Sequence, residues 1–255
     1  MKTINSMPDK PEVLNCHIHG DYEVKYINAF NGKIWVNDSC SDCIKQSDEK
    51  IRISDELEKK EQHDKVIADL KHSKRIRAGI SKRNLYKGFD DYNCSSEGQT
   101  KAINDCKRFV ETFPSDKSLI MVGGVGTGKT LLASIIIEKL VDKNKCEIIK
   151  LIEIIRCLKA SWSKNSDTDE QGVIDYFVRL DLLIIDEVGS QFGSDTEKLF
   201  IFEIIDGRYQ DMKQTILISN LDIDGIKECI GERCVDRLRE GGGSMIAFDW
   251  KSSRV

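Results

Sequence analysis

The chain has 255 residues and a net charge of −4, and it is 40% hydrophobic and 32% charged. This composition is typical of a folded protein with a core, and the negative charge excludes a bulk electrostatic attraction for nucleic acid. No apolar run approaches the roughly 20 residues of a membrane span, and the N-terminus has no apolar signal core. We therefore expect a cytoplasmic protein without membrane contact.

The region 1–44 carries two short pairs of metal-binding residue types. Cys16 and His19 form a C-x₂-H pair, and Cys40 and Cys43 form a C-x₂-C pair. Three cysteines and one histidine are a regular donor set for structural zinc, and so short a region needs metal to fold. His17 is an alternative ligand with poorer spacing. The alternative without metal is that the four side chains are unlinked residues of a turn-rich tail. We predict a small zinc-binding module over 1–44.

The next region, 45–78, is strongly charged and has apolar residues at helical spacing. These residues are Ile51, Ile53, Leu57, Val66, Ile67 and Leu70. The pattern predicts a charged helical linker. The overlapping stretch 71–87 holds seven basic and no acidic residues. It is either a contact for DNA phosphates or for an acidic protein surface, or a solvated connector.

From residue 79 to 255, apolar strands alternate with amphipathic helices. This alternation is typical of an α/β domain with a parallel sheet and helices on both faces. Five strands are expected, at 118–122, 146–151, 182–186, 215–219 and 244–248.

A complete phosphate-binding motif, GxxxxGK[ST], lies between the first of these strands and a helix. Its residues are Gly123, Gly124, Val125, Gly126, Thr127, Gly128, Lys129 and Thr130. Glycines allow the backbone amides to curl around phosphate, and the helix N-terminus adds its positive dipole end. Lys129 should reach the β- and γ-phosphates of ATP, and the Thr130 hydroxyl should bind Mg²⁺. A chance glycine-rich turn is the alternative.

Polar residues end the next two central strands. Asp186 follows an all-apolar strand and can hold Mg²⁺, and Glu187 can polarise the attacking water, which suits ATP hydrolysis. Asn220 ends the strand 215–219 and can sense the γ-phosphate. The plain alternatives are a solvated acidic turn and an asparagine that only forms a turn.

Arginines near the end of the chain are candidates for further phosphate contacts. Arg233 and Arg237 lie four residues apart on a short predicted helix, and Arg254 follows the last predicted strand. The planar guanidinium can bind a γ-phosphate within one chain or from a neighbouring subunit. Surface salt bridges with nearby acidic residues are the alternative.

Residues from about 79 to 255 resemble the DnaC/IstB branch of AAA+ ATPases, and within it the DnaC-type helicase loaders. The N-terminal region resembles that of phage and prophage loaders. The segments that carry the resemblance are 78–80, 89–92, 97–99, the phosphate-binding motif, 181–189, 204–208, 231–238 and 248–255.

The resemblance implies ATP-dependent loading of a DnaB-type hexameric helicase onto single-stranded DNA in replication. It implies self-association through the ATP site, with Arg233 as a finger supplied in trans, Arg237 close by, and Arg254 as a second sensor. The N-terminal region would bind the helicase, and the usual small helical lid would be missing. A helix containing Lys159 and Trp162 would contact DNA phosphate and bases, or is an ordinary amphipathic helix.

Two other functions stay open. An IstB-like ATPase that assists a transposase on duplex DNA would share the ATPase core. A metal-dependent nucleic-acid adaptor with a vestigial ATPase would bind nucleic acid without turnover.

Overall fold

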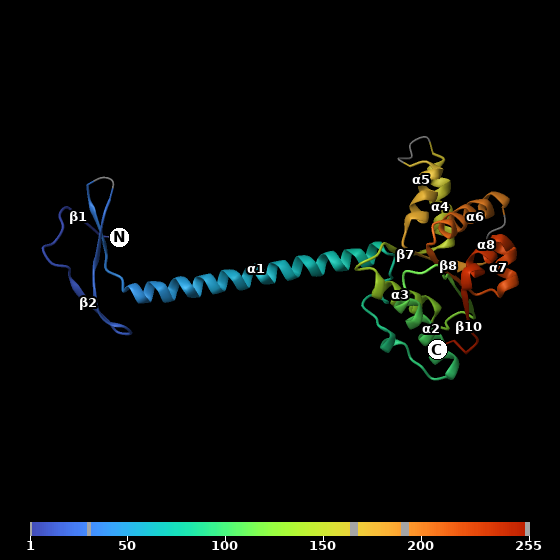
Figure 1. Cartoon of the computed structure of the whole chain (residues 1–255), viewed down its shortest axis with the longest axis horizontal. Coiled ribbons are helices and arrows are strands. Elements are labelled where there is room, and N and C mark those ends of the chain that lie inside the picture. The colour runs from blue at the N-terminus through green and yellow to red at the C-terminus, as the bar shows by residue number, and fades with distance from the viewer. Residues whose placement is uncertain (1, 30–31, 164–167, 190–193, 253–255) are drawn as a thin grey trace. The chain divides into compact units, whose positions relative to one another are not determined.

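The computed structural model describes residues 2–29, 32–163, 168–189 and 194–252. The chain divides into two compact units, which we call the N-terminal unit (Met1–Asp69) and the P-loop unit (Leu70–Val255). Helix α1 (Ser41–Arg77) contributes to both (Figure 1). The boundary between the two units, after Asp69, lies inside α1 and inside the predicted linker 45–78. Among the described residues, no helix is long and apolar enough to cross a membrane.

The N-terminal unit consists of short strands followed by a helix. One antiparallel sheet has the order β1-β5-β4, and β2 pairs with β3 in a separate two-stranded hairpin. The bounds are β1 (Lys2–Ile4), β2 (Val13–Cys16), β3 (Gly20–Glu23), β4 (Lys25–Asn28) and β5 (Ile34–Asn37). Most apolar residues of α1 are exposed, including Ile51, Leu57 and Leu70.

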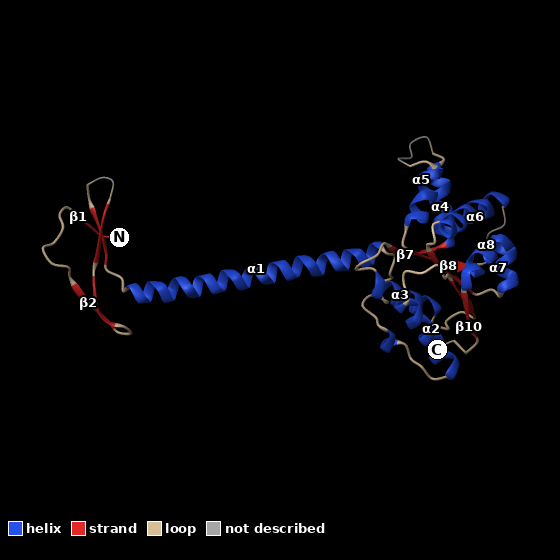
Figure 2. Ribbon diagram, viewed as in Figure 1, coloured by secondary structure: helices blue, strands red, loops and turns tan. Residues whose placement is uncertain are grey.

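The P-loop unit is built on the predicted five-stranded parallel sheet, which has the order β10-β6-β9-β8-β7. The bounds are β6 (Leu119–Gly123), β7 (Cys146–Lys150), β8 (Leu182–Val188), β9 (Gln214–Ser219) and β10 (Ser244–Phe248). Central strands such as β8 are apolar on both faces because helices cover both (Figure 2).

The two faces of the sheet form two separate apolar clusters. Because side chains alternate along a strand, Leu182 and Ile184 pack with α2 and α3, whereas Leu183 and Ile185 pack with the other helices. The helices on the first face are α2 (Glu97–Glu111) and α3 (Lys129–Leu140). On the second face lie α4 (Leu151–Ser161), α5 (Glu170–Arg179), α6 (Asp195–Gln210), α7 (Ile223–Ile230) and α8 (Glu232–Arg239). Short 3₁₀ turns form η1 (Phe89–Asp91) and η2 (Glu240–Gly242).

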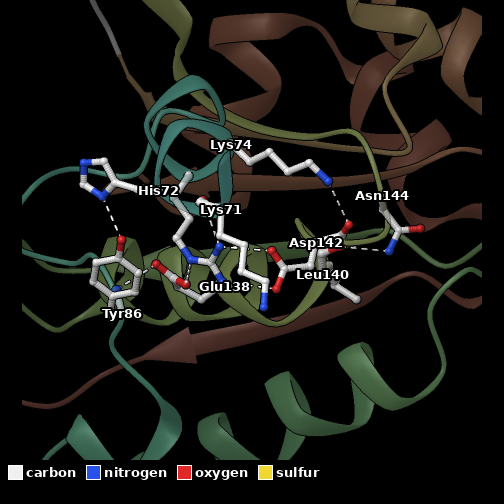
Figure 3. A network of polar contacts seen from close by, with 9 residues as sticks. Lys71, His72, Lys74, Tyr86, Glu138, Leu140, Asp142 and Asn144 are labelled. Atoms are coloured by element: carbon white, nitrogen blue, oxygen red, sulfur yellow. Dashed lines mark hydrogen bonds and ion pairs between the residues drawn. The ribbon is translucent and has the colours of Figure 1, made fainter. Parts of the chain in front are cut away.

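The end of α1 is anchored on α3 and the turn that follows it by an ion-pair network, in which Arg75 and Glu138 are buried (Figure 3). Arg75 donates to Glu138 Oε2 at 2.6 Å and to Asp142 Oδ1 at 3.0 Å. The backbone N–H of Tyr86 donates to the other oxygen of Glu138 at 2.8 Å, and Lys74 Nζ donates to the Asp142 carbonyl at 3.0 Å. The hydrogen bond from Arg75 lowers the pKa of Asp142. Two basic residues of the stretch 71–87 therefore have internal partners.

The chain then passes along the edge of the sheet at Gly79. The Ile148 amide of β7 donates to the Ala78 carbonyl at 2.9 Å. Gly79 has a φ of +78°, and a Cβ there would lie 2.0 Å from the Ile148 carbonyl oxygen. Only glycine satisfies both the left-handed backbone and the close approach.

Candidate nucleotide site and metal centre

The phosphate-binding loop is a tight turn between β6 and α3. Gly126 and Gly128 have φ angles of +79° and +97°. A Cβ at Gly128 would lie 2.6 Å from the Tyr92 ring, and one at Gly123 would lie 2.2 Å from the Phe248 carbonyl oxygen. The loop therefore requires glycine at positions 126 and 128 for its curvature, and at positions 123 and 128 for the contacts behind it. Curvature of this kind turns successive amides toward one anion.

Lys129, the first residue of α3, folds back over the loop. Its ammonium group donates to the carbonyl oxygens of Gly123 at 2.6 Å and Gly124 at 2.7 Å. Burial lowers the pKa of Lys129, and the nearby charge of Asp186 opposes this shift. The ammonium group is thus held at the loop, where a phosphate can replace the carbonyls as its partner.

Thr130, at the start of α3, and Asp186, in β8, contact each other through their side chains. The Thr130 hydroxyl donates to Asp186 Oδ2 at 2.9 Å, and the Glu187 backbone N–H donates to Asp186 Oδ1 at 2.8 Å. Burial raises the pKa of Asp186, although both hydrogen bonds oppose the shift. A hydroxyl and a carboxylate side by side are oxygen ligands suited to Mg²⁺. The structure therefore brings together the two residues expected to bind magnesium.

Glu187 lies next to this pair and has a φ of +55°. Its carboxylate is 2.9 Å from Lys150 Nζ, and both side chains are about half exposed. Lys150 ends β7 opposite Asp186 in the strand register, and the hydrogen bond to Glu187 raises the pKa of Lys150. Lys150 was not among the residues predicted from the sequence. The signal that could have found it is a lysine ending the strand beside the acidic pair.

One cavity of about 450 Å³ collects most of the predicted nucleotide-binding residues. Gly123 and Gly124 do not line the cavity, but their carbonyl oxygens accept the hydrogen bonds that position the Lys129 ammonium group in it. Asn220, just after β9, lines the cavity together with the acidic pair. The full lining is Ser81, Arg83, Asn84, Lys87, residues 125–131, Lys150, Asp186, Glu187, Ile218, Ser219 and Asn220.

Residues from the basic stretch also line this cavity. Arg83 and Lys87 add positive charge to its wall, and Asn84 is buried with its amide donating to Ser134 Oγ at 3.1 Å. A contact between this stretch and the nucleotide was not predictable from the sequence, because its place beside the loop depends on how residues 78–87 fold over α3.

The predicted arginines of α8 do not line the cavity of their own chain. Arg237 pairs with Asp206 at 2.8 Å and Glu240 at 3.1 Å, and its guanidinium carbon lies 4.5 Å from the centre of the Tyr209 ring. Arg233 is exposed, and no ion pair of it is found among the described residues. Arg254 lies outside the described residues.

The two candidate DNA contacts at the end of α4 both have acidic partners. Lys159 Nζ is 2.8 Å from Glu197 Oε1, and the Trp162 indole N–H donates to Glu170 at 2.6 Å. The Trp162 side chain is 54% exposed, so its ring still offers a face to solvent. These contacts leave the predicted role in DNA binding untested.

The four predicted zinc ligands come together in the N-terminal unit. One ligand atom from each of Cys16, His19, Cys40 and Cys43 lies within 4.8 Å of the others. His19 Nδ1 is 3.7, 3.6 and 3.4 Å from the three sulfur atoms, in chain order. A tetrahedral site with Zn–S bonds of about 2.3 Å places its ligand atoms about 3.5–3.8 Å apart. The donor set and spacing therefore fit zinc.

The surroundings of the cluster favour the thiolate form of Cys16, whereas the hydrogen bond with Cys16 raises the pKa of the Cys43 thiol to about 11. Backbone hydrogen bonds from Ile18 and His19 lower the pKa of Cys16 to about 6, which favours the thiolate form that binds metal. The Gln46 carboxamide lies 3.1 Å from His19 Nε2, where a hydrogen bond can hold the ring with Nδ1 facing the three sulfur atoms. His17 is exposed and stands outside the group, so the structure selects His19.

Comparisons with known proteins agree with this architecture. Residues 42–237 match the family model of IstB-like ATP binding proteins. The replicative helicase loader DnaC of Buchnera aphidicola subsp. Acyrthosiphon pisum is 35% identical over 180 residues, which is 70% of this chain and 73% of the relative. DnaC of Escherichia coli K12 is 33% identical with the same coverage.

Solved structures show the same fold. The crystal structure of the DnaC helicase loader aligns with a TM-score of 0.58 and 24% identity, covering 66% of this chain and 99% of that chain. The crystal structure of DnaI aligns with a TM-score of 0.56 and 24% identity, covering 69% and 94%. The chain therefore belongs to the IstB-like family of AAA+ ATP-binding proteins, as a member of its DnaC helicase-loader branch.

Proposed function

We propose that this chain is an ATPase that loads a DnaB-type hexameric replicative helicase onto single-stranded DNA. The observation that carries the proposal is the assembly of Lys129, Thr130, Asp186 and Glu187 in and around one cavity, in a chain whose relatives are replicative helicase loaders. A binding-only adaptor would not need this combination of ammonium, hydroxyl and two carboxylates.

Hydrolysis follows from the chemistry of these residues. The loop amides and the Lys129 ammonium bind the β- and γ-phosphates. Thr130 and Asp186 would hold Mg²⁺, which would supply positive charge to neutralise the phosphates. Glu187, released from Lys150, accepts a proton from the attacking water. Asn220 lines the same cavity and contacts the γ-phosphate.

Self-association completes the site. Arg233 does not line the cavity of its own chain and is exposed on α8. An exposed arginine of this kind can enter the site of a neighbouring subunit and stabilise charge in the transition state. Arg237, by contrast, holds α8 to α6 through Asp206, so we assign it a supporting role.

The N-terminal unit provides the helicase contact in this proposal. Zn²⁺ held by Cys16, His19, Cys40 and Cys43 stabilises the module 1–44, and the helical region 45–78 joins it to the ATPase domain 79–255. DNA contacts by Lys159 and Trp162 are part of the same proposal. On binding DNA, Lys159 would leave Glu197 and contact a phosphate, and Trp162 would leave Glu170 and stack on a base.

A loading assay tests the proposal. The DnaB-type helicase from the same genome is mixed with closed circular single-stranded DNA, which has no end to thread, and helicase bound to the circle is measured. Wild-type chain with ATP should raise the bound helicase at least about tenfold, and Lys129→Ala should abolish the increase because phosphate binding is lost. The matched control is Lys139→Ala, at an exposed lysine of the same helix.

Two outcomes would contradict the proposal. Wild-type chain that leaves the bound helicase unchanged would refute loading. ATP turnover stimulated by duplex but not single-stranded DNA would favour the alternative of a transposase partner.

A further inference from the structure

One carbonyl group of the phosphate-binding loop accepts two side-chain hydrogen bonds. The Tyr92 hydroxyl donates to the Thr127 carbonyl oxygen at 2.8 Å, and the Trp250 indole N–H donates to the same oxygen at 3.0 Å. A carbonyl oxygen has two lone pairs, so these donors satisfy it completely. Tyr92 follows η1 and Trp250 follows β10, so segments far apart in the chain meet at this atom.

The orientation of this carbonyl determines the orientation of the next amide. In a planar trans peptide, the Thr127 C=O and the Gly128 N–H point in opposite directions. With the oxygen held toward Tyr92 and Trp250, the Gly128 N–H points away from them. The Tyr92 ring closes the space behind Gly128, where a Cβ would lie 2.6 Å from it, and Gly128 lines the nucleotide cavity.

Both donors are themselves fixed in place. Tyr92 is buried in the apolar cluster around α2 and α3, and this burial raises the pKa of its hydroxyl to about 12. The Trp250 ring packs on Phe248, with ring centres 4.8 Å apart, and lies over Gly98 of α2, where a Cβ would be 3.4 Å from the ring. Gly123, at the other end of the loop, packs closely against the Phe248 carbonyl group. The loop is therefore supported from behind at both ends.

We propose that Tyr92 and Trp250 are positioning residues for nucleotide binding. By holding the Thr127 carbonyl, they direct the Gly128 amide toward the phosphate before the nucleotide arrives. A donor oriented in advance does not need to be reoriented on binding, which strengthens its interaction with the anion. The inference requires only ATP binding by the loop, and does not depend on the proposed helicase loading.

Equilibrium binding of ATP and ADP to Tyr92→Phe, Trp250→Phe and the double variant tests this inference. Tyr92→Phe keeps its ring and loses the hydroxyl donor, whereas Trp250→Phe keeps a smaller aromatic ring and loses the indole N–H. For each single variant we expect about 3- to 10-fold weaker binding. The double variant leaves a buried carbonyl without a partner, and we expect at least about 30-fold weaker binding. Tyr176→Phe and Trp35→Phe are matched controls, because Tyr176 hydrogen-bonds to Glu147 outside the cavity and Trp35 lies in β5.

The melting temperature of each variant without nucleotide separates positioning from general support of the fold. Binding is measured well below every melting temperature, where all variants are folded. Weaker binding by the folded variants, with both controls unchanged, supports the inference. Binding by the double variant within twofold of wild type would overturn it. If the double variant does not fold, wild-type affinity in both single variants would overturn it equally. Normal nucleotide affinity without helicase loading would refute only the proposed function.

Discussion

The two units of this protein are stabilised in different ways. In the described residues 2–29 and 32–69, only Val24, Ile34 and Cys40 are buried, and one of them is a proposed metal ligand. The P-loop unit has two extensive apolar clusters, one on each face of its sheet. The N-terminal unit buries too little apolar surface to be held by a core of its own, and for this reason we propose a bound ion there. The P-loop unit folds around its own core and can keep polar groups for chemistry.

Removal of the metal should have the largest effect and should act on the N-terminal unit alone. We expect Cys40→Ser to unfold the module 1–44, because structural zinc contributes an apparent 10–16 kcal/mol to the folding of small modules, in order-of-magnitude terms. Limited proteolysis should then cleave within 1–44 while the P-loop unit still binds Mg·ATP. Zinc content, measured by elemental analysis, should fall in parallel.

The matched control for this prediction is Cys157→Ser, at an exposed cysteine outside the cluster. It should keep both zinc and protease resistance. A Cys40→Ser protein that lacks metal and yet resists cleavage over 1–44 would show that the module folds without zinc.

The second prediction concerns the buried ion pair that anchors α1 within the P-loop unit. Arg75→Met leaves the Glu138 carboxylate buried without its ionic partner, and we expect a loss of about 3–5 kcal/mol in the free energy of unfolding. Glu138→Gln in the same chain removes the stranded charge and should recover part of this loss. Denaturant unfolding of the two variants measures both effects.

The ion pair between Lys45 and Asp42 is the matched control, because both of its side chains are exposed. Lys45→Met should change the stability by less than about 1 kcal/mol. Equal effects of Lys45→Met and Arg75→Met would contradict the assignment of Arg75 as an anchor.

The third prediction separates chemistry from stability inside the P-loop unit. Glu187→Gln should lower ATP turnover at least about 100-fold, because the side chain can no longer accept a proton from water. Its stability should change by less than about 1 kcal/mol, since Glu187 and its partner Lys150 are both about half exposed. Steady-state turnover and thermal unfolding of one preparation provide the two measurements. Turnover equal to wild type would remove Glu187 from the mechanism.

Contiguous motifs were predictable from the sequence, and contacts between distant segments were not. The sheet and the phosphate-binding loop could be predicted because each strand is a short apolar run and the loop is one unbroken motif. The grouping of Cys16, His19, Cys40 and Cys43 could be predicted from their spacing, with His17 left open as an alternative, and zinc binding itself stays a prediction. The place of Lys150 beside Glu187 depends on the pairing of β7 with β8, which local sequence does not reveal.

Other features were hidden for related reasons. Arg75 lies in a stretch whose charge pattern indicates a solvated helix, and its burial arises only because α3 provides Glu138. The segments around Tyr92 and Trp250 were noticed through family resemblance, but their meeting at the Thr127 carbonyl is a tertiary contact.

Native mass spectrometry tests the central claim, that one chain joins a metal-stabilised helicase contact to an ATP site. The chain is mixed with its DnaB-type helicase, ATP and single-stranded DNA, and the masses of intact complexes are measured. The account predicts a helicase hexamer carrying this chain, with one zinc ion and one nucleotide for each copy. Helicase and chain that remain separate, although both are folded and the chain holds nucleotide, would contradict it.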